Sequence, residues 1–136
     1  MATTFDAYVS DRGKKWMTAC HPQPDVVAEV ASDLIHRIRK TRELGPLYGR
    51  EKDDPIKKLQ GFENLWESRV RHATGIYRQF FRFASVNGSR SVVFVDGVVK
   101  KSRLLSRQEL VTFDRRLDAY LDDLSDPQIR TKDLVR

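Results

Sequence analysis

Basic side chains are concentrated in the middle of the chain, between Lys57 and Arg107. This stretch holds 11 Lys and Arg residues against three acidic residues, whereas the whole chain of 136 residues has a formal net charge of +6. A small surface that gathers cations is suited to bind a polyanion. Arg offers a planar fork of donors that matches a phosphate, and Lys can move protons where nearby positive charges lower its pKa. The pattern favours nucleic acid as the partner class, with an anionic membrane or an acidic protein as alternatives.

Two short segments of alternating polarity carry the central part of this charge. In residues 65–71 one face is the more apolar, and the other face carries Glu67, Arg69 and Arg71. In residues 76–83, Tyr77, Phe81 and Phe83 share one face, and Arg78 and Arg82 share the opposite face. Because side chains alternate between the two faces of a strand, both segments are predicted to be strands. The arginines would then share one face of a sheet, with the aromatic residues in the core.

The elements that must position these strands follow from periodicity and from turn signals. A short strand is predicted over residues 4–9, a brief helix over 11–19 and a long amphipathic helix over 25–44. Asn87-Gly88 indicates a hairpin turn before a buried strand over residues 91–95. The last helix is predicted from a capping-box spacing and an apolar face, which comprise Ser106, Glu109, Leu110, Phe113, Leu117 and Leu121.

This order of elements predicts an α+β fold. We expect a small, mainly antiparallel sheet, with an N-terminal block of two helices packed on one face and a C-terminal helix. The other face of the sheet would carry the arginines. Residues 1–121 are assigned to this domain. Residues 122–136 lack apolar periodicity, so we expect them to form a loosely ordered tail.

The composition limits the class of protein. With 40% apolar and 32% charged residues, the chain is typical of one soluble globular domain. No stretch approaches the roughly 18 apolar residues of a membrane span, and the N-terminal residues lack the apolar run of a signal peptide. Cys20 is the only cysteine, which argues against a disulfide framework and a cysteine metal site. We expect a cytoplasmic protein with no metal and no cofactor.

Several motifs, in this order and at these distances, resemble one protein family. They include the segment Gly49-to-Gly61, the leucine–aromatic–Glu–x–Arg motif of residues 65–69, the triplet of residues 76–78, and the strand that ends at residues 99–101. The terminal amphipathic helix completes the pattern. Together they resemble the RelE/ParE superfamily of toxins, and more narrowly its phage-derived Gp49-like, HigB-type branch.

The resemblance implies a fold, a partner and an activity. The fold would be compact and similar to microbial RNases. The partner would be an antitoxin, usually encoded next door and often containing a helix-turn-helix domain. Members similar to RelE and HigB cleave mRNA in the ribosomal decoding site, where the 2′-hydroxyl attacks the adjacent phosphate without a metal. ParE-type members instead poison DNA gyrase and cut nothing.

The resemblance also implies roles for individual residues. Arg78 would hold the scissile phosphate, while Arg69 and Lys101 would stabilise charge or assist proton transfer, so these three residues are the catalytic candidates. The RNA-binding candidates are Lys57, Lys58, Arg71, Arg82, Lys100 and Arg103. His72 and Glu67 are candidates for proton transfer, although a solvated loop histidine and a structural ion pair with a cross-strand Arg are the alternative readings.

One departure from the family pattern keeps other functions open. Well-studied members carry a Tyr or His near the C-terminus that acts as acid or base, whereas this chain has Ser106-Arg107-Gln108 in that region. The metal-free basic cluster favours a ribosome-dependent mRNA endonuclease. The missing Tyr or His favours either a gyrase-directed toxin without enzymatic activity or a non-toxic nucleic-acid-binding module of phage origin.

Overall fold

The computed structural model describes residues 4–102 and 104–136. Its elements, in chain order, are β1 (Asp6–Val9), α1 (Asp11–Ala19), α2 (Pro24–Leu44), the 3-10 helix η1 (Gly45–Arg50), β2 (Ile56–Lys58), β3 (Trp66–His72), β4 (Gly75–Val86), β5 (Ser89–Lys100), α3 (Arg107–Asp123) and α4 (Pro127–Asp133). The sequence patterns predicted most of these elements, but they did not predict η1, β2 or α4.

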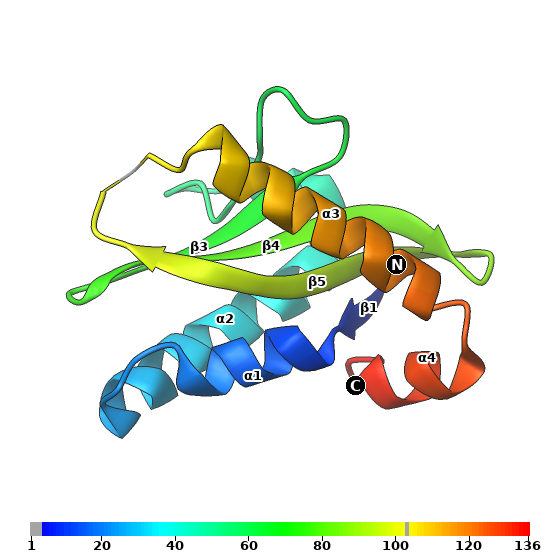
Figure 1. Cartoon of the computed structure of the whole chain (residues 1–136), viewed down its shortest axis with the longest axis horizontal. Helices are drawn as coiled ribbons and strands as arrows, with labels where there is room; N and C mark the ends of the chain where they lie inside the picture. The colour runs from blue at the N-terminus through cyan, green and yellow to red at the C-terminus, as the bar shows by residue number, and fades with distance from the viewer. Residues whose placement is uncertain (1–3, 103) are drawn as a thin grey trace.

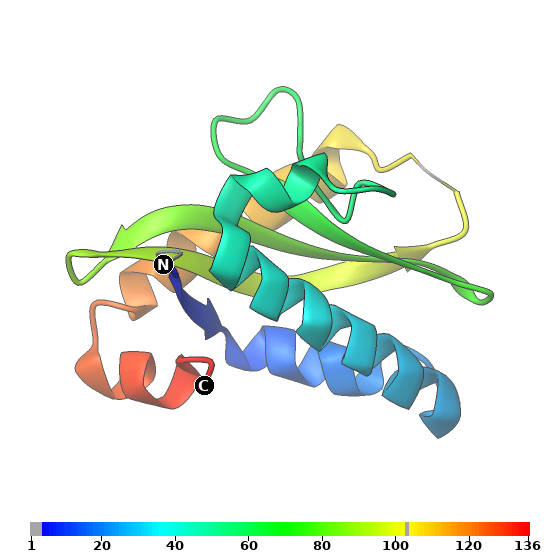
Figure 2. The same cartoon turned by 180° about the vertical axis from the view of Figure 1, so that it is seen from behind.

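Five strands form one sheet in the order β1-β5-β4-β3-β2. β1 pairs with β5 in parallel, and every other neighbouring pair is antiparallel. Helices α1 and α2 lie on one face, and α3 crosses the opposite face (Figures 1 and 2). The predicted α+β class and mainly antiparallel sheet are confirmed.

Local sequence signals explain where the elements begin and end. The Ser10 side chain accepts a hydrogen bond from Gly13 N and caps α1. Ser106 and Glu109 form the predicted capping box at the start of α3. Asn87 and Gly88 both have positive φ, at 50° and 78°, which is the backbone that a two-residue hairpin turn between β4 and β5 requires.

Each face of the sheet carries its own core. Tyr77, Phe81 and Phe94 pack toward α1 and α2, whereas Phe80 and Phe113 belong to a second core beneath α3. The rings of Phe80 and Phe113 are stacked, with centroids 4.2 Å apart. Helix α3 therefore covers part of the arginine face, a placement that the sequence did not predict. The apolar side chain at position 80, between Arg78 and Arg82 on the same face, has to be buried, and α3 buries it.

The C-terminal residues are ordered, which corrects the expected loose tail. Helix α3 ends at Asp123 and α4 follows. Val135 N then donates to Ala7 O, and Leu134 forms an isolated bridge with Tyr8 on the free edge of β1. An open strand edge is a liability in a folded protein, and the chain covers this one with its own end.

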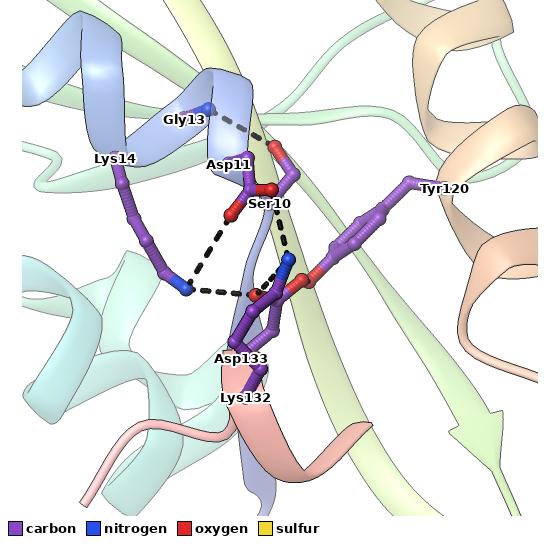
Figure 3. Close-up of polar contacts among 7 residues, drawn as sticks. All are labelled: Ser10, Asp11, Gly13, Lys14, Tyr120, Lys132 and Asp133. Atoms are coloured by element: carbon purple, nitrogen blue, oxygen red, sulfur yellow. Dashed lines mark hydrogen bonds and ion pairs between the residues drawn. The ribbon is translucent and has the colours of Figure 1, made fainter. Parts of the chain in front are cut away.

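A polar cluster attaches α4 to α1 and α3 (Figure 3). Asp133 is 3% exposed, and its two oxygens accept from Lys14 Nζ at 2.7 Å and from the Tyr120 hydroxyl at 2.8 Å. Burial, together with the bond to Asp133, raises the pKa of Tyr120. Tyr120 is thus a protonated structural group that holds the end of the chain in place.

Replacing Asp133 by Ala should lower the free energy of unfolding by about 1–3 kcal/mol, because the Tyr120 hydroxyl would be left buried without its acceptor. Urea unfolding measures this change. Asp11→Ala is the matched control, since it removes the exposed pair between Asp11 and Lys132, which should be worth less than about 1 kcal/mol. Equal losses from the two variants would contradict a structural role for the buried cluster.

Candidate active site

The register of the strands brings most of the predicted cations together on the α3 side of the sheet. Paired residues of neighbouring strands point to the same face. Arg69 pairs with Arg78 and then Val98, Arg71 with Ile76 and then Lys100, and Lys57 with Glu67. We call this set the basic strip and define it as Lys57, Arg69, Arg71, Arg78 and Lys100.

The deepest part of the basic strip is an ion pair. Arg78 Nη1 lies 2.6 Å from Glu67 Oε2, and each residue is only 3% exposed. This geometry matches the structural reading of Glu67, in which it pairs with a cross-strand Arg. It is also a departure from the expectation for Arg78, because that side chain belongs to the packed interior and Glu67 offsets its charge.

Arg69 lies directly opposite Arg78 in the strand register. Two like charges in facing positions of a strand pair disfavour folding, and one buried carboxylate cannot offset both. Among the described residues no ion pair reaches Arg69, and its buried Nε has no hydrogen-bond partner there. Burial lowers the pKa of this guanidinium, Glu67 and, to a smaller extent, Asp54 oppose that effect, and the charges of Arg71 and Arg78 add to it. Arg69 is therefore a half-buried cation whose surroundings would accept an anion.

Exposed cations flank Arg69 on the same face. Arg71 is exposed and donates from Nη1 to Asp53 O at 3.2 Å, which leaves its charge in place. Lys57 is exposed at the register position opposite Glu67. Lys58, the next residue, pairs with Trp66 and points to the α1–α2 side. Lys57 therefore shares the face of the basic strip, and Lys58 does not.

The end of β5 contributes the remaining lysines. Lys100 Nζ lies 3.3 Å from Glu109 Oε1, so a carboxylate of α3 partly offsets its charge. The backbone N–H of Ser106, with a smaller contribution from Lys100, lowers the pKa of Glu109. Lys101 is exposed directly after the strand. Arg103 lies outside the described residues.

Two predicted site residues are engaged elsewhere. Arg82 shares the face of Arg78, but it forms ion pairs of 2.7 Å and 2.6 Å with Asp114 and Asp118 of α3. Two carboxylates offset its charge, so it anchors the helix and is not available to bind RNA. His72 bonds Glu29 of α2 through Nε2 at 2.7 Å and Thr74 through Nδ1 at 2.9 Å. It packs against Tyr77 on the opposite face of the sheet, so the structure does not bring it together with the basic strip.

A backbone irregularity shapes the sheet behind Arg78. The pairing of β4 with β5 shifts between Gln79 and Phe81, and a Cβ at Gly97 would overlap the carbonyl oxygen of Arg78. Gln79 Nε2 donates to Val95 O at this point. Bulges of this kind often adjoin functional sites because they redirect side chains. An isolated Gly inside an apolar strand is the sequence signal that could have predicted the bulge.

The described residues of the site provide positive charge, and few of them could take part in chemistry of another kind. None of the residues described forms a group of three or more His, Cys, Asp or Glu side chains that could hold a metal ion. No helix in the described part of the chain is long and apolar enough to cross a bilayer. The arrangement can bind an anion at Arg69, beside Arg78, whose side chain is held by the buried carboxylate of Glu67.

The fold and the basic strip define a small α+β protein with a cationic site on one sheet face. Residues 25–118, more than half of the chain, match the family described as phage derived protein Gp49-like, and the chain belongs to that family. The family is associated with toxins of the RelE and HigB type. No curated protein and no solved structure matches the chain.

Proposed function

We propose that the protein is the toxin of a type II toxin–antitoxin system and that it cleaves mRNA on the ribosome. The observation that carries this proposal is the state of Arg69, a half-buried cation opposite a second arginine, without an ion-pair partner in the part of the chain that is described. Such a group is prepared to receive a phosphate. The family membership supports a toxin, and the partner in this proposal is a cognate antitoxin whose acidic residues meet the basic strip.

The proposed reaction is an internal transfer at one phosphate of the RNA. The 2′ oxygen forms a bond to phosphorus as the bond from phosphorus to the 5′ oxygen breaks, which leaves a 2′,3′-cyclic phosphate and a 5′-hydroxyl. The 2′-hydroxyl loses a proton and the leaving oxygen gains one. Only RNA supplies this nucleophile.

Each cation has a part in this proposal. Arg69 binds the phosphate and stabilises the charge that develops on its oxygens. Arg78 keeps a fixed second positive charge beneath it, held in place by Glu67. Lys101, exposed after β5, is the group we assign to donate the proton to the leaving oxygen. Arg71 and Lys57 bind neighbouring parts of the strand.

The second candidate is a gyrase-directed toxin that binds without catalysis. The observation that favours it is Ser106-Arg107-Gln108, which stands where well-studied family members carry the Tyr or His that acts as acid or base. His72 lies on the other face, and Tyr120 is buried with Asp133. The fold by itself supports both activities.

Inducing the protein alone should arrest growth, with translation falling before DNA replication. Mapping transcript ends after induction should reveal new 5′-hydroxyl ends within translated regions. Co-expression of the cognate antitoxin of this proposal should restore growth. If DNA supercoiling collapses first while transcripts stay intact, the gyrase-directed candidate replaces the endonuclease.

A further inference from the structure

Two carboxylates form ion pairs with the basic strip, and they differ in exposure. In the described part of the chain, Glu67 reaches the strip through Arg78, and Glu109 reaches it through Lys100. The Glu67 side chain is 4% exposed, so it does not face a ligand that lies on the surface. The Glu109 side chain, in the first turn of α3, is 32% exposed. Of the two carboxylates, Glu109 is the one that a bound molecule would meet.

Glu109 is held by one oxygen and presents the other. Its Oε1 accepts from Lys100 Nζ at 3.3 Å, from Ser106 N at 3.3 Å and from the Ser106 hydroxyl at 3.2 Å. No donor among the described residues reaches Oε2. The backbone N–H of Ser106 lowers the pKa of Glu109, so this side chain is ionised at neutral pH. The result is a fixed carboxylate with one oxygen open to accept a proton.

Glu109 and Arg69 border the same row of the sheet from opposite sides. The row runs from Arg69 on β3 through Arg78 on β4 to Val98 on β5. Its ends are about 10 Å apart, which is two strand spacings. Helix α3 packs against β4 and β5 on this side of the sheet (Figure 1), and Glu109 contacts Lys100, two residues beyond Val98. A nucleotide whose phosphate binds Arg69 would therefore have the carboxylate on its α3 side.

We infer that Glu109 takes the proton from the 2′-hydroxyl, an inference that rests on the mRNA cleavage proposed above. The proton moves to Oε2 as the 2′ oxygen forms its bond to phosphorus. The bond from phosphorus to the 5′ oxygen breaks, and Lys101 gives a proton to that oxygen. The carboxylic acid and the neutral amine that result exchange protons with water, which restores both groups. A positioned proton acceptor typically contributes about 10²–10⁴-fold to a rate.

The structural alternative is that Glu109 only positions the loop before α3. Its Oε1 holds Lys100 and Ser106, which lie on either side of Lys101 in the chain. Loss of these bonds would displace Lys101 and so weaken proton donation to the leaving oxygen. The two roles therefore differ in which half of the reaction fails when Glu109 is changed.

The test compares two model mRNAs bound to the ribosome, one with the ordinary linkage and one with sulfur in place of the 5′ oxygen at the cleavage position. A thiolate leaves without receiving a proton, so the sulfur linkage bypasses the proton donor and still requires the proton acceptor. The variants are Glu109→Gln and Lys101→Ala, in single-turnover cleavage at saturating protein. Gln is accepted at this position of a capping box, so the turn should keep its fold. Ser106→Ala is the matched control, because it removes the capping hydroxyl and leaves the carboxylate in place.

Glu109→Gln should slow cleavage of both mRNAs by about 10²–10⁴-fold, whereas the sulfur linkage should restore most of the rate of Lys101→Ala. Ser106→Ala should lower the midpoint of urea unfolding and still cut both mRNAs at nearly the rate of the parent. A Glu109→Gln variant that cuts as fast as Ser106→Ala, or whose rate the sulfur linkage restores, would overturn the assignment of Glu109. Cleavage by the parent protein in the same assay would then leave the proposed function standing. A parent protein that cuts neither mRNA would contradict the proposed function, and the assignment with it.

Discussion

Arg69→Ala should slow cleavage of ribosome-bound mRNA by about 10²–10³-fold, the loss expected when a preorganised charge is removed from a transition state. The fold should survive, because Arg69 has no ion pair with the described residues and faces the like charge of Arg78. The unfolding midpoint should stay the same or rise. The measurement is cleavage by purified variants, with urea unfolding of the same samples.

Two variants sharpen this prediction. Arg69→Lys should recover only part of the rate, because a point charge cannot repeat the bidentate contact of a guanidinium. Arg90→Ala is the matched control, since Arg90 is an exposed cation at the far hairpin, next to the Phe5 ring. If Arg69→Ala cuts as fast as the parent protein, or if Arg90→Ala is the crippled variant, the site lies elsewhere.

Arg78→Ala should have its largest effect on the fold. The variant leaves Glu67 buried and without its ion-pair partner at 2.6 Å, and breaking a buried pair in this way typically costs about 3–5 kcal/mol. The midpoint of urea unfolding should fall sharply, and cleavage should fall both because less protein is folded and because the second positive charge is lost. The burial of both side chains is the reason that the main effect falls on the fold.

The control for Arg78 removes both charges at once. Glu67→Leu combined with Arg78→Met replaces the pair with apolar side chains of similar size, which is often neutral or stabilising. This double variant should unfold close to the parent, and it should still cleave slowly, because the fixed charge beneath the phosphate is gone. A single Arg78→Ala variant with the stability of the parent would show that Glu67 does not depend on this arginine.

Much of the fold could be predicted because local periodicity carries it. The alternation of residues 65–71 and 76–83 predicted which side chains share a face, and Trp66, Val70, Tyr77 and Phe81 do lie in or against the core beneath α1 and α2. The Asn87-Gly88 turn and the Ser106–Glu109 capping box depend on neighbouring residues, so their signals are complete within a few positions.

Which arginine forms a structural ion pair could not be predicted in the same way. Alternation puts Arg69, Arg78 and Arg82 on one face, and it cannot distinguish among them. The distinction comes from the carboxylates that the fold brings to each arginine. Asp114 and Asp118 of α3 form ion pairs with Arg82, whereas Glu67 on the neighbouring strand forms an ion pair with Arg78.

The sequence by itself determined most of the strands and helices, the shared face of the arginines and the family motifs, because each of these depends on residues close together in the chain. The tertiary structure alone decided that α3 covers half of that face, that His72 turns away from it and that residues 127–135 bind the edge of β1. Those outcomes depend on which distant side chains meet. A cation becomes a binding group or a structural one according to the carboxylates that the fold brings within reach.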